Sequence, residues 1–248
     1  MSYLCISDYE GTLIKNDNTI SDYTVSIINK FIIDNNFIIV SESSFDELID
    51  FKNKYNLNID LISTNDGILL INNKIIKYEI DLNILSNLFN IFKSDIYTAY
   101  NDKYIYNYQE RLKIMYPKDY IITDKFISST YINIAINILK NDEFISFLKE
   151  NELSYKLIGK DKNRAFYNIK KKDINKDNIY ELLIKLYPNK KTIGFADSYS
   201  DFKLLSNLDI KIAMKNSDNL LKEKCDYITN YSNGEDGLAK YLNDICHF

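Results

Sequence analysis

The stretch that decides the fold is SDYEGTLI (residues 7–14), which directly follows the apolar run YLCI at residues 3–6. The apolar run is typical of a short buried strand. Two carboxylates, Asp8 and Glu10, stand two residues apart where that strand should end. Because like charges side by side do not stabilise a buried structure, the pair is either solvated loop or part of a reactive site.

Composition sets the outer limits of the interpretation. A chain of 248 residues can bury a sizeable core, as one large domain or two modest ones. The formal net charge is -4, from 31 Lys and Arg against 35 Asp and Glu, and neither sign gathers into a long block. This argues against nucleic acid as the main partner. We expect a monomer or a dimer.

Targeting signals and cysteine chemistry are also constrained. The N-terminus lacks the pattern of a secretory leader, and no apolar run approaches the roughly 20 residues needed to span a bilayer, so we expect a cytoplasmic protein with no membrane partner. The three cysteines are too scattered for a disulfide framework or a zinc site, and His247 is the single histidine. Any catalysis must therefore be carried out by carboxylates, lysine and hydroxyls.

The first part of the chain alternates strand and helix patterns. Strands are expected at 3–6, 37–40 and 59–63, with helices over 21–33 and after a capping-box spacing at Ser44 and Glu47. This rhythm predicts an α/β fold with a Rossmann-like parallel sheet.

Residues 68–80 break the alternating rhythm. Asn72-Asn73 lies between two strand-like runs there, which indicates a hairpin.

A different pattern occupies residues 82–170, where helical stretches and Tyr-rich strand runs suggest an inserted α+β domain with an antiparallel sheet. The alternating rhythm then resumes to the C-terminus, with strands expected at KTIGF, IKIAM and DYIT. We therefore expect a core domain made of 1–81 and 171–248, and a second domain, 82–170, inserted into it.

A second acidic loop, FADSYSD (residues 195–201), places Asp197 and Asp201 just past the strand-like KTIGF. Ligands of open parallel sheets bind beyond the carboxyl ends of the strands. If this strand and the first one are neighbours, the acids converge, and such a cluster requires a hard cation such as Mg²⁺. The alternative is that each loop merely caps a helix.

Taken together, these pieces resemble the haloacid dehalogenase (HAD) superfamily, and in particular its Cof-type phosphatases with a large α+β cap. The first family motif, DxDGTL, is similar to residues 8–13, and the fourth, GDxxNDxxML, to ADSYSDFKLL. Ser41 fits the second motif and Lys176 the third. The stretches IAMKNSDNLLKEKCDYIT and GEDGLAKYL are similar to the usual ending of the subfamily.

The resemblance implies a phosphoric monoester hydrolase that works through an aspartyl-phosphate. Asp8 would be the nucleophile and Glu10 the general acid and base. The implied Mg²⁺ ligands are Asp8, the backbone carbonyl of Glu10, Asp197 and Asp201, the last directly or through water. The residues implied to hold the phosphoryl oxygens are Ser41, Lys176 and Thr12. The expected substrates are small phosphorylated metabolites, sugar phosphates ahead of nucleotides and cofactor phosphates.

Several positions depart from the family pattern. Glu10 replaces the usual Asp, and SESS at 41–44 replaces a segment that usually reads Thr-Gly-Arg. Asp177, Ala196 and Ser200 replace two glycines and an asparagine. These departures leave open the alternative that the chain is a catalytically weak protein, one that binds a phosphorylated ligand or has a regulatory role. A receiver domain phosphorylated on Asp8 ranks last, because the chain is too long and carries a large insert.

Aromatic and basic residues of the insert have two interpretations each. The tyrosines of its strand-like runs could line a ligand pocket, but sheet surface or core is favoured: Tyr97, Tyr100, Tyr104, Tyr106 and Tyr108. Arg111 and Arg164 could grip an anionic substrate, but surface salt bridges are favoured.

Overall fold

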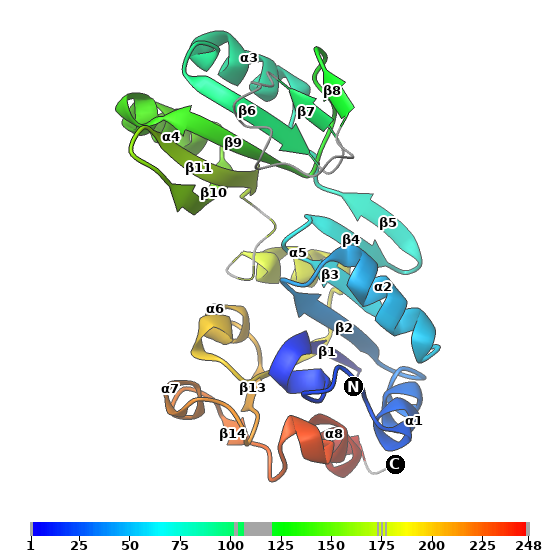
Figure 1. The fold of residues 1–248 in the computed structure, drawn as a ribbon. Helices are drawn as coiled ribbons and strands as arrows, with labels where there is room; N and C mark the ends of the chain where they lie inside the picture. The colour runs from blue at the N-terminus through cyan, green and yellow to red at the C-terminus, as the bar shows by residue number, and fades with distance from the viewer. Residues whose placement is uncertain are drawn as a thin grey trace. The chain divides into compact units, whose positions relative to one another are not determined.

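The computed structural model describes residues 2–101, 104–106, 121–172, 174, 176 and 178–246 (Figure 1). The chain divides into two compact units. The core unit comprises Met1–Ile76 and Asp173–Phe248, and the insert unit comprises Lys77–Lys172. Tyr108 and Arg111, which the sequence analysis singled out, lie outside the described residues.

An eight-stranded sheet forms the centre of the core unit, in the order β14-β13-β12-β1-β2-β3-β4-β5. Neighbouring strands from β14 to β3 are parallel, and β4 runs antiparallel to β3. The predicted α/β fold with a Rossmann-like sheet is confirmed. The strands span β1 (Tyr3–Ser7), β2 (Asn36–Ser41), β3 (Asp60–Ser63), β4 (Ile68–Ile71), β5 (Lys74–Lys77), β12 (Lys191–Ala196), β13 (Ile210–Ala213) and β14 (Tyr227–Ile228).

The hairpin predicted at Asn72-Asn73 joins β4 to β5. Both asparagines have a positive φ, 49° and 60°, which is the left-handed conformation that a two-residue hairpin turn of this kind requires. Asparagine tolerates this conformation better than other residues with a side chain. The turn therefore forms without a glycine.

Helices cover both faces of the core sheet. One face packs α1 (Asp22–Phe31), α2 (Phe45–Lys54) and α8 (Gly237–Cys246) against alternate strand residues such as Cys5 and Ile39. On the other face Gly194 of β12 lies against α6 (Phe202–Leu205), because a Cβ there would come within 2.5 Å of Leu205. The remaining core helices are α5 (Ile179–Leu186) and α7 (Asn219–Lys222).

Two local features of the core unit concern a helix cap and the cysteines. The cap predicted at Ser44 is confirmed, since its hydroxyl accepts a hydrogen bond from the N–H of Glu47 at the start of α2. All three cysteines are free thiols. Cys5 is fully buried in β1, whereas Cys225 and Cys246 are partly buried.

The insert unit contains a six-stranded sheet in the order β10-β11-β9-β6-β7-β8. Four of its five neighbouring pairs are antiparallel as predicted, but β7 and β8 run parallel, which corrects the expectation of a purely antiparallel sheet. The expected helices are present as α3 (Leu82–Phe92) and α4 (Asn141–Glu150). The strands span β6 (Ile96–Asn101), β7 (Tyr104–Tyr106), β8 (Ile121–Thr123), β9 (Tyr131–Asn137), β10 (Leu153–Lys160) and β11 (Arg164–Lys171).

Strands β8 and β9 were not predicted from the sequence. The signal for β9 was nevertheless present, because Ile132, Ile134 and Ile136 recur with the two-residue period of a strand and are all buried.

Among the described residues, no helix has both the length and the hydrophobicity needed to cross a bilayer.

Candidate active site

The first and second acidic loops begin side by side because β1 and β12 are adjacent parallel strands. Ser7 at the end of β1 is in register with Phe195, and the N–H of Asp8 donates to the carbonyl of Phe195 at 3.0 Å. The predicted convergence required this adjacency. Beyond Asp8 the chain makes one wide turn, η1 (Tyr9–Leu13), before it reaches helix α1.

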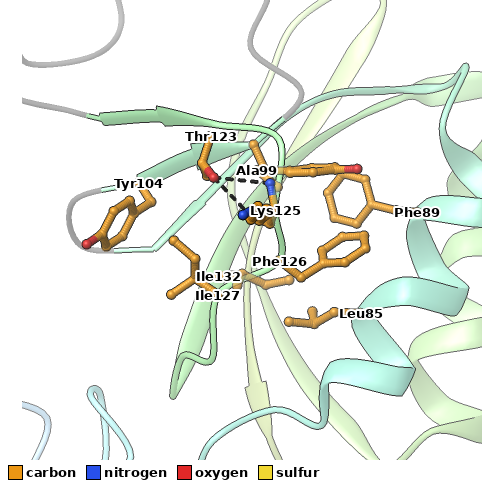
Figure 2. Close-up of a pocket in the computed structure, with 10 residues that line it drawn as sticks. Leu85, Phe89, Ala99, Tyr104, Thr123, Lys125, Phe126, Ile127 and Ile132 are labelled. Carbon is orange, nitrogen blue, oxygen red and sulfur yellow. Dashed lines mark hydrogen bonds between the residues drawn. The ribbon is translucent and has the colours of Figure 1, made fainter.

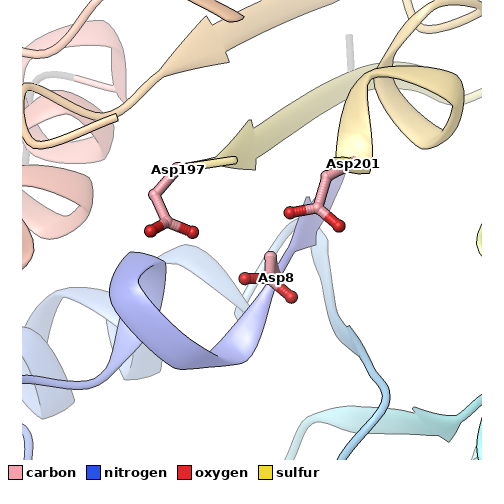
Figure 3. Close-up of side chains that lie close together, drawn as sticks. All are labelled: Asp8, Asp197 and Asp201. Carbon is pink, nitrogen blue, oxygen red and sulfur yellow. The ribbon is translucent and has the colours of Figure 1, made fainter. Parts of the chain in front are cut away.

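Three carboxylates meet at this edge of the sheet. Asp8, Asp197 and Asp201 each place a carboxylate oxygen within 4.8 Å of the others (Figure 3). Asp8 and Asp201 are buried, with only 5% and 3% of their surface exposed. Asp201 lies in the short 3-10 turn η4 (Tyr199–Asp201) that leads into α6, so two different loops and a helix start supply the three acids.

Lys176 brings one positive charge into this cluster. Its Nζ lies 2.6 Å from Oδ1 of Asp8 and 2.7 Å from Oδ1 of Asp201. Among these four side chains, three carboxylates against one ammonium leave two negative charges. Buried charges of one sign require a partner, and carboxylate oxygens are the ligands that Mg²⁺ prefers. The donor set therefore fits a divalent cation of this kind.

The electrostatics of the acids agree with that charge count. Burial raises the pKa of Asp8 to about 7, and Asp201 adds to the rise while Lys176 opposes it. Burial and Asp201 also raise the pKa of Asp197. Burial alone would lower the pKa of Lys176, but the carboxylates of Asp8 and Asp201 more than offset it and raise the pKa above its ordinary value. The acids are thus held at a cost that an additional cation would relieve.

Gly11 allows the first loop to approach Asp197 closely. Its φ is +70°, and a Cβ at this position would lie 2.2 Å from Oδ2 of Asp197. The next residue, Thr12, is buried, and its hydroxyl donates to Oδ1 of Asp197 at 3.3 Å. The glycine and threonine of the first loop therefore fix the position of a carboxylate from the second.

Two asparagines that the sequence analysis did not assign also hold this loop. The amide of Asn216 donates to the carbonyl of Gly11 at 2.8 Å, and the N–H of Asn233 donates to the side chain of Asn216 at 2.9 Å. The amide of Asn233 donates to the carbonyl of Ile14 at 2.8 Å. The signal available was that both residues lie in or beside the C-terminal stretches that were noted for their similarity to the family ending.

Ser41 and Glu10 are connected to each other through Ser43. Ser41 is buried at the end of β2, and its Oγ accepts a hydrogen bond from the N–H of Ser43 at 2.9 Å. The hydroxyl of Ser43 donates to Oε1 of the exposed Glu10 at 3.1 Å. The structure thus brings Asp8, Thr12, Lys176, Asp197 and Asp201 together, and joins Glu10 to the end of β2 through Ser43.

Residues 5–242 match the sequence model of a family described as haloacid dehalogenase-like hydrolases. The chain belongs to this family. The resemblance stated from the motifs, and the expectation of a hydrolase, are therefore confirmed. No curated protein matches the chain significantly.

Solved structures share this fold across nearly their whole length. A protein from Thermotoga maritima has a TM-score of 0.69 at 18% identity, with 98% of this chain and 97% of that chain covered. A HAD phosphatase from Bacteroides thetaiotaomicron has a TM-score of 0.65 at 15% identity, with 100% and 96% covered. A HAD subclass IIB sugar phosphatase has a TM-score of 0.58 at 14% identity, with 99% and 100% covered.

The insert of this HAD-like chain contains an apolar pocket next to β6 and β7 (Figure 2). Its volume is about 30 Å³, enough to hold a water molecule. Tyr104 and Tyr106 line it, and the Tyr106 ring packs edge-on against Phe89 with ring centres 4.5 Å apart. The Tyr106 ring is therefore part of the packing of the insert, as favoured.

Arg164 is also accounted for within the insert. Its guanidinium lies 2.5 Å from Oδ2 of Asp161 and 5.5 Å from the centre of the Tyr97 ring. The favoured interpretation of Arg164 as a salt-bridge residue is confirmed.

Proposed function

We propose that this chain is a Mg²⁺-dependent phosphatase of small phosphorylated metabolites, with sugar phosphates as the first substrate class. The observation that carries the proposal is the cluster of Asp8, Asp197 and Asp201 with a single lysine at the carboxyl ends of β1 and β12. Family membership supplies the hydrolase chemistry. The likeness to a HAD subclass IIB sugar phosphatase, a match at the level of the fold, supports the choice of substrate class.

Each residue has a definite task in the proposed reaction. A carboxylate oxygen of Asp8 attacks phosphorus in line, the bond to the leaving oxygen breaks, and Glu10 gives that oxygen its proton. Glu10 then takes a proton from water, which attacks the aspartyl-phosphate and releases inorganic phosphate and free Asp8. Lys176, Ser41 and Thr12 hold the phosphoryl oxygens, and the Thr12 hydroxyl also orients Asp197.

The residues proposed to hold Mg²⁺ are Asp8, Asp197, Asp201 and the backbone carbonyl of Glu10. When bound, the cation would neutralise the two excess negative charges and stabilise the charge that develops on the phosphoryl oxygens. Lys176 contacts one oxygen each of Asp8 and Asp201 and so already offsets part of the negative charge that the cation would meet.

A catalytically weak protein that binds phosphorylated ligands is the second candidate. The observation that favours it is Glu10, which is exposed and carries one methylene more than the aspartate usual in the family. If the longer side chain misplaces the acid, the protein would bind the substrate without protonating its leaving group.

Release of inorganic phosphate from a panel of sugar phosphates, nucleotides and cofactor phosphates, with Mg²⁺ and with chelator, tests the proposal. We expect Mg²⁺-dependent turnover of a few sugar phosphates, and none by Asp8→Asn. No turnover of any substrate by folded protein that binds Mg²⁺ would contradict the phosphatase and support the binding protein. Turnover that persists in chelator would contradict the proposed metal.

A further inference from the structure

Ser43 occupies the position where the family usually has an arginine, and its backbone is fixed on both sides. Its N–H donates to Oγ of Ser41 at 2.9 Å, and its carbonyl accepts from the hydroxyl of the fully buried Ser63 at 2.8 Å. Ser63 Oγ in turn accepts from the N–H of Asp66 at 3.2 Å, which ties the segment to the loop after β3. The direction in which the Ser43 side chain points is therefore set by neighbouring strands.

The Ser43 hydroxyl is directed at the one acid of the site that lies outside the metal cluster. It donates to Oε1 of Glu10 at 3.1 Å. Glu10 is exposed, and a glutamate side chain has one rotatable bond more than an aspartate, so its carboxyl group needs a contact to fix its position. Among the hydrogen bonds described above, the one from Ser43 reaches this carboxyl group. This contact holds Oε1, and within the described part of the chain none of the hydrogen bonds given above engages Oε2.

We propose that Ser43 is a positioning residue for Glu10, and that it compensates for the additional methylene of the glutamate. The inference rests on the proposed phosphatase function and on Glu10 as its general acid. In the first step the proton leaves the Oε2 atom of Glu10 and joins the leaving oxygen as the P–O bond breaks, while Ser43 keeps its own proton. The serine therefore aligns the acid without exchanging a proton with the substrate.

The test uses two substrates that differ in their need for an acid. The leaving group of an alkyl phosphate is a poor one, an alkoxide, unless an acid protonates its oxygen. The leaving group of 2,4-dinitrophenyl phosphate, dinitrophenolate, departs without a proton. Release of the leaving group is followed in single turnovers with excess enzyme, so that hydrolysis of the aspartyl-phosphate does not contribute. We expect Ser43→Ala to slow the alkyl phosphate by about 10- to 100-fold and the aryl phosphate by less than about 2-fold.

Matched variants separate positioning from structure. Ser43→Thr keeps the hydroxyl and should restore most of the rate with the alkyl phosphate. Ser44→Ala removes a hydroxyl one residue further on, where it caps α2, and should lower the melting temperature without changing the ratio of the two rates. In a Glu10→Asp background the shorter acid cannot reach Ser43 in the same way, so adding Ser43→Ala should have no further effect.

Each outcome has a separate meaning. Equal loss on both substrates, or no loss on either, overturns the role of Ser43. If Glu10→Gln shows the leaving-group dependence and Ser43→Ala does not, Glu10 is the acid and only the inference about Ser43 fails. If wild-type protein releases neither leaving group, the proposed phosphatase function itself fails.

Discussion

Both ends of the core sheet hold a buried aspartate, but the two carboxylates have very different neighbours. Asp8 stands at the carboxyl end of β1 and shares the Lys176 ammonium with Asp201. Asp60 stands at the amino end of β3, where it accepts a hydrogen bond from the hydroxyl of Tyr187 and another, at 2.8 Å, from the N–H of Asn72. One acid is in a cluster of like charges, and the other has a neutral donor on each oxygen.

The surroundings of Asp60 are polar without being charged in excess. A hollow of about 220 Å³ at this end is lined mainly by amides, namely Asn35, Asn36, Asn58, Asn72 and Asn73. Burial, together with the hydrogen bond to Asp60, raises the pKa of Tyr187, so the phenol remains a proton donor. Buried acids by themselves therefore do not indicate a site. The excess of negative charge around Lys176 distinguishes the proposed active site from the structural end of the sheet.

The largest expected difference between the two ends is in turnover. Asp8→Asn should lower the rate of phosphate release by at least about a thousandfold, because an amide cannot act as the nucleophile. Asp60→Asn should leave the rate within about twofold, because the substituted residue is at the other end of the sheet from the cluster. The phosphate-release assay measures both. Retained activity in Asp8→Asn would remove the covalent mechanism.

The metal requirement should separate the ends as well. Asp197→Ala removes one of three clustered carboxylates, so the Mg²⁺ concentration that gives half of the maximal rate should rise by about tenfold or more. Titration of activity with Mg²⁺ measures this, with Asp60→Asn as the control that should keep the wild-type midpoint. An unchanged midpoint in Asp197→Ala would show that the proposed ligand set is wrong.

Asp60→Asn should affect stability although it leaves activity nearly unchanged. Asp60→Asn replaces one of the two carboxylate oxygens by an NH₂ group, so the side chain can accept from Tyr187 or from Asn72 but not from both, which should cost about 1–3 kcal/mol of unfolding free energy. For a chain of this length that corresponds to a melting temperature lower by roughly 2–12 °C. Thermal unfolding in chelator checks this value. A melting temperature equal to that of the wild type would mean that Asp60 contributes no net stability.

The last prediction concerns pH. Folding raises the pKa of Asp8 to about 7. The unfolded chain loses this proton near pH 4, so between about pH 4 and 7 only the folded state retains it, and stability falls as pH rises through that window. In chelator the melting temperature should therefore decline as pH rises through this range, and Asp8→Asn should flatten the decline. An equal slope in both proteins would contradict the shift.

Much of this arrangement follows from local sequence, and the remainder does not for identifiable reasons. The alternation of apolar runs and helical patterns predicted the α/β core, and Asn72-Asn73 predicted its hairpin. Convergence of Asp8 with Asp197 depended on which strands are neighbours, and strand order is set by packing between distant parts of the chain. The motif resemblance, rather than periodicity, supported that adjacency before the structure showed it.

Two features that depend on contacts between distant parts of the chain were not predicted. The contact between Ser43 and Glu10 requires the turn after β2 to be fixed by Ser63, which no local pattern indicates. In the insert the parallel pairing of β7 with β8 is equally non-local. Site residues identified by type were therefore easier to predict than the residues that orient them.

The three free thiols described with the core have a consequence for how the protein tolerates oxidants. Burial raises the pKa of all three, to about 11 for Cys225, and Cys246 adds to the rise at Cys5. Since the thiolate is the reactive form, these cysteines should react slowly with alkylating agents and peroxide at neutral pH. None of them contributes to the proposed chemistry. An iodoacetamide-treated sample should keep its phosphate-release activity, so catalysis would require no reducing environment.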